Sequence, residues 1–363
     1  MTADAVGGVW QYSLDLAGSL RPRGVETTIA VLGPPPTDDQ QRDAERAGVA
    51  IVVTELPLDW TATSAHEVDE AGAAILRLAE ANASDVVHLN SPALAANRRF
   101  TAPVVAVAHS CVATWWRAVR EGPLPPEFRW RSELVRLGYR AADAVLAPSE
   151  AFAEATQQIY RLAAKPEVVR NGRRASGVSV AGREETFVFT AGRLWDEGKN
   201  VGALDRAAGR ISIPVVAAGP LSGPNGARVR VEHVRSLGAL DDEGIARQLA
   251  KQPIFVSTAL YEPFGLAVLE AAQAGCALVL SDIPTFREMW DGVATFVPPR
   301  SDEAVAAVID HLARDPDARR RLGTAARDRA GSYSTEAMGS GVLAVYRSLL
   351  ASGSKSRMKE AAA

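Results

Sequence analysis

The 363-residue chain has little cysteine, little lysine and no long apolar run. Its two cysteines, Cys111 and Cys276, lie far apart beside apolar segments, so neither a disulfide framework nor a thiolate metal site is expected. No segment approaches the ~20 apolar residues of a membrane-spanning helix, and the N-terminus has neither the basic start nor the apolar stretch of a signal peptide. The sequence therefore predicts a cytoplasmic protein, with peripheral membrane contact left open.

Neither sign of charge dominates, since 40 Lys and Arg residues stand against 43 Asp and Glu residues for a formal net charge of -3. Binding to a phosphate backbone needs clustered Lys and Arg, and no basic block is present, so nucleic acid is not an expected partner. A content of 47% hydrophobic and 23% charged residues is ordinary for a globular protein. A small molecule is therefore the better expected ligand.

Short β-branched runs alternate with helical stretches rich in Ala, Leu and Arg, which is the pattern of βαβ units. Expected strands in the first half are 27–32, 50–54, 85–89, 104–108 and 144–147, and the second half repeats the pattern from ETFVFTAGR to CALVLSD. Strands that are apolar on both faces belong to parallel sheets covered by helices on both sides. The sequence predicts an α/β protein of two Rossmann-like, doubly wound domains facing a central cleft, because ligands bind at the carboxyl ends of such sheets.

The length favours two domains at about 150 residues each, and clustered glycines locate the boundary. The expected linker is Lys165–Arg183, which contains glycines 172, 177 and 182. We divide the chain into an N-terminal domain, a C-terminal domain, a C-terminal helix and a polar, frayed tail. These four parts are residues 1–172, 173–331, 332–351 and 352–363. Whether the C-terminal helix crosses back to the N-terminal domain is left open.

The segment STALYEPFGLAVLEAAQAG carries most of the chemical signal. It follows the expected strand PIFVS and is typical of a helix that begins at Pro263, where the missing N–H costs nothing. The amides of Phe264, Gly265 and Leu266 would then be free donors at the positive end of the helix dipole, which suits a phosphate group. Gly265 would also allow close approach of the backbone to a ligand.

Two carboxylates accompany this helix. Glu262 is expected at its entrance and Glu270 about two turns further, roughly 12 Å along the axis. That span matches a nucleotide sugar, with hexose hydroxyls at Glu262 and ribose hydroxyls at Glu270. With seven residues between the two acids of EPFGLAVLE, the sequence resembles the retaining glycosyltransferases of family 4, the group 1 glycosyltransferases, which have the GT-B fold. The alternative is a strand–loop–helix unit with two solvated acids.

A cationic loop, TAGRLWDEGKN, follows the expected strand ETFVF. The resemblance implies that Arg193 and Lys199 face the donor diphosphate, whose developing charge on departure needs cations or helix ends. No Asp-x-Asp motif occurs at a strand-to-loop corner, so we expect no metal and no cofactor. A solvated charged loop is the alternative for Arg193 and Lys199.

Two other nucleotide-binding motifs fail on spacing. Five residues separate Gly192 from Gly198 where a P-loop requires four, and Asn200 replaces the Ser or Thr that would hold Mg²⁺. The glycines at 219, 223 and 226 lack the dinucleotide spacing, and a proline intervenes. Triphosphate and dinucleotide binding are therefore disfavoured.

The first half contributes two further candidates. Gly7 and Gly8 precede an amphipathic helix and resemble the Gly-rich first loop of the family, which suits close approach to a diphosphate or sugar; a simple turn is the alternative. His109 ends an apolar strand, and the resemblance implies contact with the donor sugar, against a structural alternative. No functional role is expected for histidines 66, 88, 233 and 311. The aromatic segment TWWRAVREGPLPPEFRW either stacks on a sugar ring or fills a core.

One departure from the family concerns the first strand. Only MTADAV precedes Gly7, where family members have a complete central strand. A shortened strand would leave an unpaired edge inside the domain. We therefore expect translation to start upstream, with Met1 an internal residue of that strand.

The resemblance spans nearly the whole chain and implies a retaining, metal-independent glycosyltransferase. A hexose would move from a nucleoside diphosphate sugar, bound by the C-terminal domain, to a hydroxyl of a sugar, lipid-linked sugar or small molecule on the N-terminal, acceptor-side domain. Two alternatives stay open: a sugar-nucleotide epimerase or phosphorylase of the same fold, and a non-catalytic nucleotide-sugar binding protein. The nucleotide base, the sugar, the acceptor, the linkage and the oligomeric state do not follow from the sequence.

Overall fold

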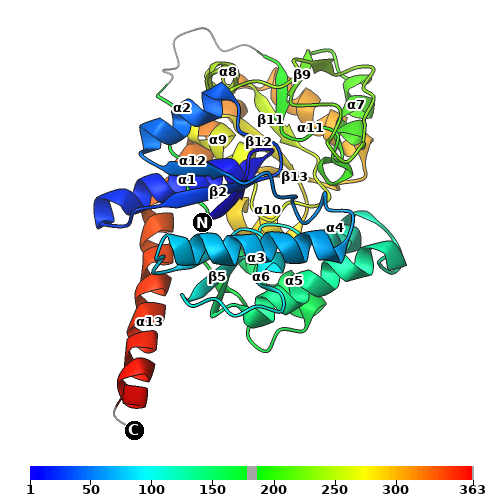
Figure 1. The fold of residues 1–363 in the computed structure, drawn as a ribbon. Coiled ribbons are helices and arrows are strands. Elements are labelled where there is room, and N and C mark those ends of the chain that lie inside the picture. Colours follow the sequence, from blue (N-terminus) through cyan, green and yellow to red (C-terminus); the bar gives the residue numbers. More distant parts are fainter. Residues whose placement is uncertain (178–185, 362–363) are drawn as a thin grey trace. The chain divides into compact units, whose positions relative to one another are not determined.

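The computed structural model describes residues 1–177 and 186–361, and its chain forms two compact units. The first unit contains Met1–Gly172 together with the chain from Thr335 onward, and the second contains Arg173–Ser334. Figure 1 traces the chain from the blue N-terminal strand to the red C-terminal helix. No helix among the described residues is both long and apolar enough to cross a membrane.

The first unit contains seven parallel strands in two hydrogen-bonded ladders, of order β1-β2-β3 and β4-β5-β6-β7. Their bounds are β1 Thr2–Asp4, β2 Thr28–Leu32, β3 Ala50–Val53, β4 Val87–Leu89, β5 Val104–Val107, β6 Ala144–Ala147 and β7 Glu167–Val168. Asn90, directly after β4, joins the ladders: its amide Nδ2 donates to the Thr2 carbonyl oxygen at 2.7 Å, and its backbone N donates to Thr2 Oγ1 at 3.0 Å. Strand order therefore reverses between β1 and β4, which is where ligands bind in doubly wound folds.

The MTADAV segment does form a strand despite its shortness. Thr2 of β1 lies opposite Ala30 of β2, and the contacts of Asn90 cover the other edge of β1. The unpaired edge that we expected inside the domain is therefore bridged by one side chain.

Seven α-helices complete the described part of the first unit. They are α1 Gly8–Leu20, α2 Asp38–Ala47, α3 Ala65–Ala81, α4 Val112–Val119, α5 Arg129–Ala141, α6 Glu150–Tyr160 and α13 Thr335–Ala361, with short 3-10 turns at Arg21–Arg23, Pro92–Ala95 and Pro126–Phe128. Side chains cap several of them: Thr37 forms a capping box with Gln40, and Ser149 accepts from the backbone N of Phe152 at 3.2 Å.

The C-terminal helix α13 packs on α1 and belongs to the core of the first unit. Its buried residues Met338, Val342, Leu343, Val345 and Tyr346 share a cluster with Tyr12, Leu16, Leu20 and the strands β5 and β6. The helix does not end near residue 351 but continues to Ala361, because this segment has no proline and contains Lys, Arg, Met, Glu and Ala, which favour helix. The frayed tail expected from residue 352 is therefore wrong over the described residues.

The second unit is one six-stranded parallel sheet of order β10-β9-β8-β11-β12-β13. The strands are β8 Val188–Ala191, β9 Val215–Ala218, β10 Arg235–Ser236, β11 Ile254–Ser257, β12 Ala277–Ser281 and β13 Thr295–Val297. Its helices are η4 Glu197–Lys199, α7 Val201–Ala208, α8 Asp242–Leu249, α9 Leu266–Gln273, α10 Pro284–Trp290, α11 Asp302–Arg314 and α12 Pro316–Ala330. The order reverses between β8 and β11, so the loops after these two strands flank the expected ligand position.

Both faces of this sheet are buried, as predicted from the doubly apolar strands. Phe189 and Phe255 face one core cluster, while their neighbours Val188 and Ile254 face a second. Successive side chains of a strand point to opposite faces, so one apolar run serves two cores. The predicted doubly wound α/β class is confirmed.

The expected linker Lys165–Arg183 is partly wrong. Glu167–Val168 within it forms β7 by pairing with β6, and the boundary between the two units falls between Gly172 and Arg173 in the sequence. Residues 178–185, including Gly182 and Arg183, lie outside the described part of the chain.

Candidate active site

The loops after β8 and β11 are joined by hydrogen bonds at the switch point of the second sheet. The backbone N of Leu260 donates to the Gly198 carbonyl oxygen at 2.8 Å. Asn200 donates through Nδ2 to the carbonyl oxygens of Thr258 at 3.0 Å and Pro299 at 2.7 Å. Asp196 Oδ1 accepts from the backbone N of Gly198 at 2.9 Å. These hydrogen bonds therefore fix the cationic loop at Gly198 and at Asn200.

Lys199 and Glu262 meet across these two loops. Lys199 Nζ donates to Glu262 Oε2, and the two side chains are only 24% and 14% exposed. An ion pair with little access to water attracts more strongly than one at the surface. The structure thus brings together one predicted cation and one predicted carboxylate, 63 residues apart in the sequence.

Arg193 stays within its own loop. Its Nη2 donates to Asp196 Oδ2 at 3.1 Å, its guanidinium lies 5.7 Å from the ring centroid of Trp195, and its side chain is 36% exposed. The neighbouring Gly192 has a φ of +146°, and a Cβ atom on Gly219 would lie 1.8 Å from the Gly192 carbonyl oxygen. The loops after β8 and β9 therefore pack too closely for a side chain at Gly219.

Helix α9 begins at Leu266 and not at Pro263, which corrects the predicted helix start. Gly265 is the N-cap with a φ of +97°, a conformation that favours glycine, and the first intrahelical bond runs from the Leu269 backbone N to the Gly265 carbonyl oxygen at 3.0 Å. Phe264 is 3% exposed and packs edge-on against Tyr333. The amides without an intrahelical acceptor are therefore those of residues 265–268 rather than 264–266.

Glu262 lies in the loop before α9 rather than at its first turn. A Cβ atom on Gly265 would be 3.4 Å from Glu262 Cγ, so the side chain of Glu262 rests against the backbone of Gly265. The carboxylate and the positive end of the helix are therefore close together.

Glu270, in the middle of α9, pairs with a residue that the sequence did not single out. Arg173 Nε donates to Glu270 Oε1 at 2.6 Å, and Arg173 Nη2 donates to Asp242 Oδ2 at 2.7 Å. Asp241 caps α8 by accepting from the backbone N of Gly244 at 2.8 Å. Asp241 is thus a helix cap, and Asp242 is an ion-pair partner. No cluster of three or more His, Cys, Asp or Glu side chains suited to a metal ion occurs in the described ranges.

In the first unit, His109 lies two residues after the end of β5. Its Nε2 lies 2.9 Å from Asn90 Oδ1, and the Asn90 amide is oriented because its Nδ2 also donates to Ser13 Oγ at 3.0 Å. An amide oxygen only accepts, so Nε2 of His109 carries the proton and Nδ1 is the acceptor of the neutral ring. Loss of solvation lowers the pKa of His109 to about 3, and the ring stacks edge-on against Tyr12 at 4.5 Å.

Gly7 and Gly8 form the turn between β1 and α1. Gly7 is the N-cap and Gly8 the first residue of α1, and Asp4 Oδ1 accepts from the backbone N of Val6 at 2.9 Å and of Gly7 at 3.2 Å. The predicted glycine loop thus follows the strand at which the order of the first unit reverses, one strand away from Asn90.

Two family models match the chain in succession. Residues 6–175 match "Glycosyltransferase Family 4", and residues 184–329 match "Glycosyl transferases group 1". This chain belongs to the family 4, group 1 glycosyltransferases. The predicted family is therefore confirmed.

Two relatives align with nearly all of this glycosyltransferase. A phosphatidyl-myo-inositol mannosyltransferase of Mycobacterium leprae is 26% identical over 97% of this chain and 96% of its own length. A glycogen synthase of Mycobacterium tuberculosis is 25% identical over 90% and 87%. The first is named for the transfer of mannose and the second for the synthesis of glycogen.

Solved structures share the fold. The sucrose-phosphate synthase of Thermosynechococcus elongatus has a TM-score of 0.78 at 18% identity over 97% of this chain and 99% of that chain. Anabaena HepE, solved with UDP-glucose, has a TM-score of 0.70 at 18% identity over 96% and 99%. The predicted GT-B fold of the glycosyltransferase is confirmed.

Sequence reasoning missed two residues that orient the glycosyltransferase's candidate groups. Asn90 fixes the ring of His109, and Arg173 holds Glu270. Asn90 in DVVHLNSP ends an expected strand beside His88, so its position at the carboxyl edge was a usable signal. The sequence gives no such signal for Arg173, because it is one of many arginines and its partner Glu270 lies 97 residues away.

Two other groups in the first unit have structural contacts. His88 lies between Tyr346, whose OH is 2.7 Å from Nδ1, and Tyr12, whose OH is 3.4 Å from Nε2, and burial lowers its pKa. Trp116 packs against Phe128, with 6.0 Å between ring centroids. His88 thus anchors α13, whereas Trp116 and Phe128 of the aromatic segment are half-buried and pack against each other.

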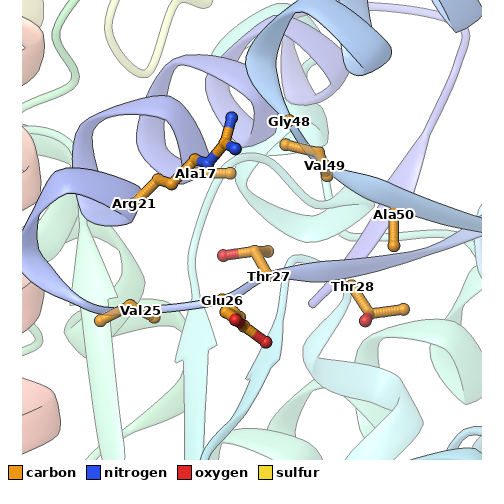
Figure 2. A pocket seen from close by; sticks show the side chains of 9 residues that line it. All are labelled: Ala17, Arg21, Val25, Glu26, Thr27, Thr28, Gly48, Val49 and Ala50. Atoms are coloured by element: carbon orange, nitrogen blue, oxygen red, sulfur yellow. The ribbon is translucent and has the colours of Figure 1, made fainter.

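A cavity of about 220 Å³ lies at the other edge of the first unit's sheet. Figure 2 shows its lining, Ala17, Arg21, Val25, Glu26, Thr27, Thr28, Gly48, Val49 and Ala50. These residues surround the starts of β2 and β3, with Arg21 directed toward Gly48. The candidate residues of this unit, Gly7, Gly8 and His109, come after the carboxyl ends of β1 and β5, so this cavity is separate from them.

Proposed function

We propose that this glycosyltransferase transfers a hexose from a nucleoside diphosphate sugar to a hydroxyl acceptor, with retention of configuration and without a metal. The observation that carries the proposal is the pairing of Lys199 with Glu262 at the switch point, beside the glycine-capped start of α9. A cation, a carboxylate and first-turn amides at one sheet edge suit a phosphorylated sugar. The UDP-glucose complex of HepE and the mannosyltransferase name of the Mycobacterium leprae relative support a donor of this class.

Departure of the nucleoside diphosphate is the step at which most charge develops. Arg193, Lys199 and the α9 amides from Leu266 onward neutralise that charge, and Gly265 lets the phosphates approach. On binding, the diphosphate replaces Glu262 as partner of the Lys199 ammonium. Glu262 is then left to accept hydrogen bonds from hexose hydroxyls and orient the sugar.

The other candidates position the two ends of the donor. Glu270 accepts hydrogen bonds from the ribose hydroxyls. In the first unit, Gly7 and Gly8 admit the donor to the start of α1, and the neutral ring of His109 accepts a hydrogen bond from a sugar hydroxyl through Nδ1. Because its pKa is low, this histidine stays neutral near neutral pH and does not act as a general acid.

Retention requires the acceptor to attack the face from which the diphosphate departs. We assign no enzymatic nucleophile and propose a same-face route, in which the departing diphosphate takes the proton of the acceptor hydroxyl. The acceptor is a hydroxyl of a sugar, a lipid-linked sugar or a small molecule, bound by the first unit.

A donor-by-acceptor screen that detects released nucleoside diphosphate tests the function. UDP-, GDP- and ADP-hexoses should each be tried with sugar, lipid-linked and small-molecule hydroxyl acceptors, and the anomeric configuration of the product read by NMR. Acceptor-dependent release and a retained anomer support the proposal. Turnover without an acceptor points to an epimerase, turnover with inorganic phosphate points to a phosphorylase, and an inverted product refutes retention.

A further inference from the structure

Arg173 is fixed at both its backbone and its side chain. Its carbonyl oxygen accepts from Gln273 Nε2 at 2.8 Å, and its backbone N donates to the Tyr333 carbonyl oxygen at 3.3 Å. The side chain is 10% exposed, against 23% for Glu270 and 64% for Asp242. Arg173 is therefore an ordered cation placed between α8 and α9.

The guanidinium holds the two acids with different nitrogen atoms. Nε donates to Glu270 at 2.6 Å and Nη2 to Asp242 at 2.7 Å, and a planar guanidinium presents these donors in a fixed geometry. Glutamate has several rotatable bonds, and ordering them on ligand binding costs free energy. An anchored arginine orders the carboxylate of Glu270 before any ligand arrives.

A carboxylate held in this way can still bind hydroxyls. Its two oxygens accept about four hydrogen bonds, so a bond from Arg173 is compatible with further donors. The vicinal hydroxyls of a ribose need a carboxylate of fixed orientation, since both donors must be met by one group.

We propose that Arg173 is a positioning residue that orients Glu270 toward the ribose diol and so sets the preference for ribonucleotides over 2′-deoxyribonucleotides. The inference rests on the proposed function, because it takes Glu270 as the ribose-binding group. It predicts that a change at Arg173 mainly reduces the contribution of the 2′-hydroxyl to binding affinity. A general loss of packing would instead weaken the binding of ribonucleotide and 2′-deoxyribonucleotide alike.

The test is calorimetric titration with a nucleoside diphosphate and its 2′-deoxy counterpart, using whichever base the wild type binds. Loss of one hydrogen bond to a charged group corresponds to a wild-type preference for the ribonucleotide of about tenfold or more. We expect Arg173→Ala and Glu270→Gln each to reduce this ratio to within about threefold, and the double variant to match Glu270→Gln. Arg174→Ala, which changes an exposed neighbour, should leave the ratio at its wild-type value.

Arg173→Lys keeps the test valid if the alanine variant misfolds, since it retains a cation but loses the planar pair of donors. For this variant we expect an intermediate ratio of ribonucleotide to 2′-deoxyribonucleotide affinity and a near-native unfolding temperature. A wild-type ratio in Arg173→Ala and Arg173→Lys, with a collapsed ratio in Glu270→Gln, overturns the role of Arg173 alone. A ratio above wild type in Arg173→Ala also overturns it, because the arginine would then compete with the ribose. An unchanged ratio in Glu270→Gln refutes the ribose assignment itself, while acceptor-dependent turnover still tests the proposed transferase function separately.

Discussion

Replacing Glu262 by Gln should separate nucleoside diphosphate affinity from turnover. The two side chains have the same shape, and Gln can still accept from Lys199 Nζ through its amide oxygen. The bond keeps its charged donor but loses the charge of its acceptor, and we take its weakening as the difference between a bond to a charged group, about 1.5–3 kcal/mol, and a neutral bond, about 0.5–1.5 kcal/mol. Because both side chains are at most 24% exposed, little of this difference is lost to solvent screening. The attraction that holds Lys199 to its partner is thus weakened by about 1–1.5 kcal/mol.

The freed ammonium should bind a diphosphate more tightly, by about five- to tenfold. Turnover should fall by on the order of 10² or more, because the carboxylate no longer orients the hexose in the transition state. Calorimetry with UDP, GDP and ADP measures the first quantity, and nucleoside diphosphate release at saturating substrates measures the second. Glu243→Gln, which removes an exposed partner of Arg247 on α8, is the matched control and should change neither.

Unchanged turnover in Glu262→Gln would remove this residue from the site. Weaker diphosphate binding would refute the exchange of partners at Lys199, since it would mean that Glu262 assists the diphosphate rather than competing for the ammonium.

Three further outcomes follow from the site. Arg193→Ala and Lys199→Ala should each weaken nucleoside diphosphate binding by about ten- to a hundredfold, as expected for a lost charge-assisted bond. Calorimetry on the double variant should give a loss of binding free energy smaller than the sum of the two single losses, because both residues bind one diphosphate. Full additivity would contradict a shared ligand. Turnover should survive excess EDTA after exhaustive dialysis, and activity restored only by Mg²⁺ or Mn²⁺ would refute the metal-free mechanism. The pKa of His109 in the folded state, about 3, lies below its ordinary value of 6.5, so the unfolded chain binds more protons between these two pH values. The neutral ring therefore contributes its full stability above pH 6.5, and this contribution is lost as the pH falls toward 3. Urea unfolding should therefore show a smaller loss of stability from pH 7 to pH 4 in His109→Gln than in the wild type. Equal losses would contradict the desolvation of this ring.

The strands of both units were predictable because their signal is local. Runs such as Val188–Ala191 and Ala277–Ser281 are apolar on both faces, and only a covered parallel sheet buries both. The loops that follow them were equally visible, since a glycine or a charged residue directly after such a run lies at the carboxyl edge. His109 was found in this way, whereas Lys199 and Glu262 were singled out by the cationic loop and the two-acid motif further along the loops.

The rest depends on contacts distant in sequence or on a single backbone angle. Proline favoured a helix start at Pro263, yet the left-handed conformation of Gly265 moved that start by three residues. The bond from Arg173 to Glu270 spans 97 residues, and the bonds from Asn90 to Thr2 span 88. No periodicity in one sequence encodes which of many arginines meets which acid.

The path of the chain has a consequence for synthesis. The first unit is interrupted by the whole of Arg173–Ser334 and is completed by α13, whose Met338 and Val342 are buried against α1. Domains generally fold as they emerge from the ribosome, beginning with the N-terminal one. Here all residues of the second unit are translated before those of the first unit are complete. The apolar face of α1 stays exposed until α13 has been translated. The domain that begins first is therefore the last to finish, and during that interval it is the part of the nascent chain most exposed to aggregation.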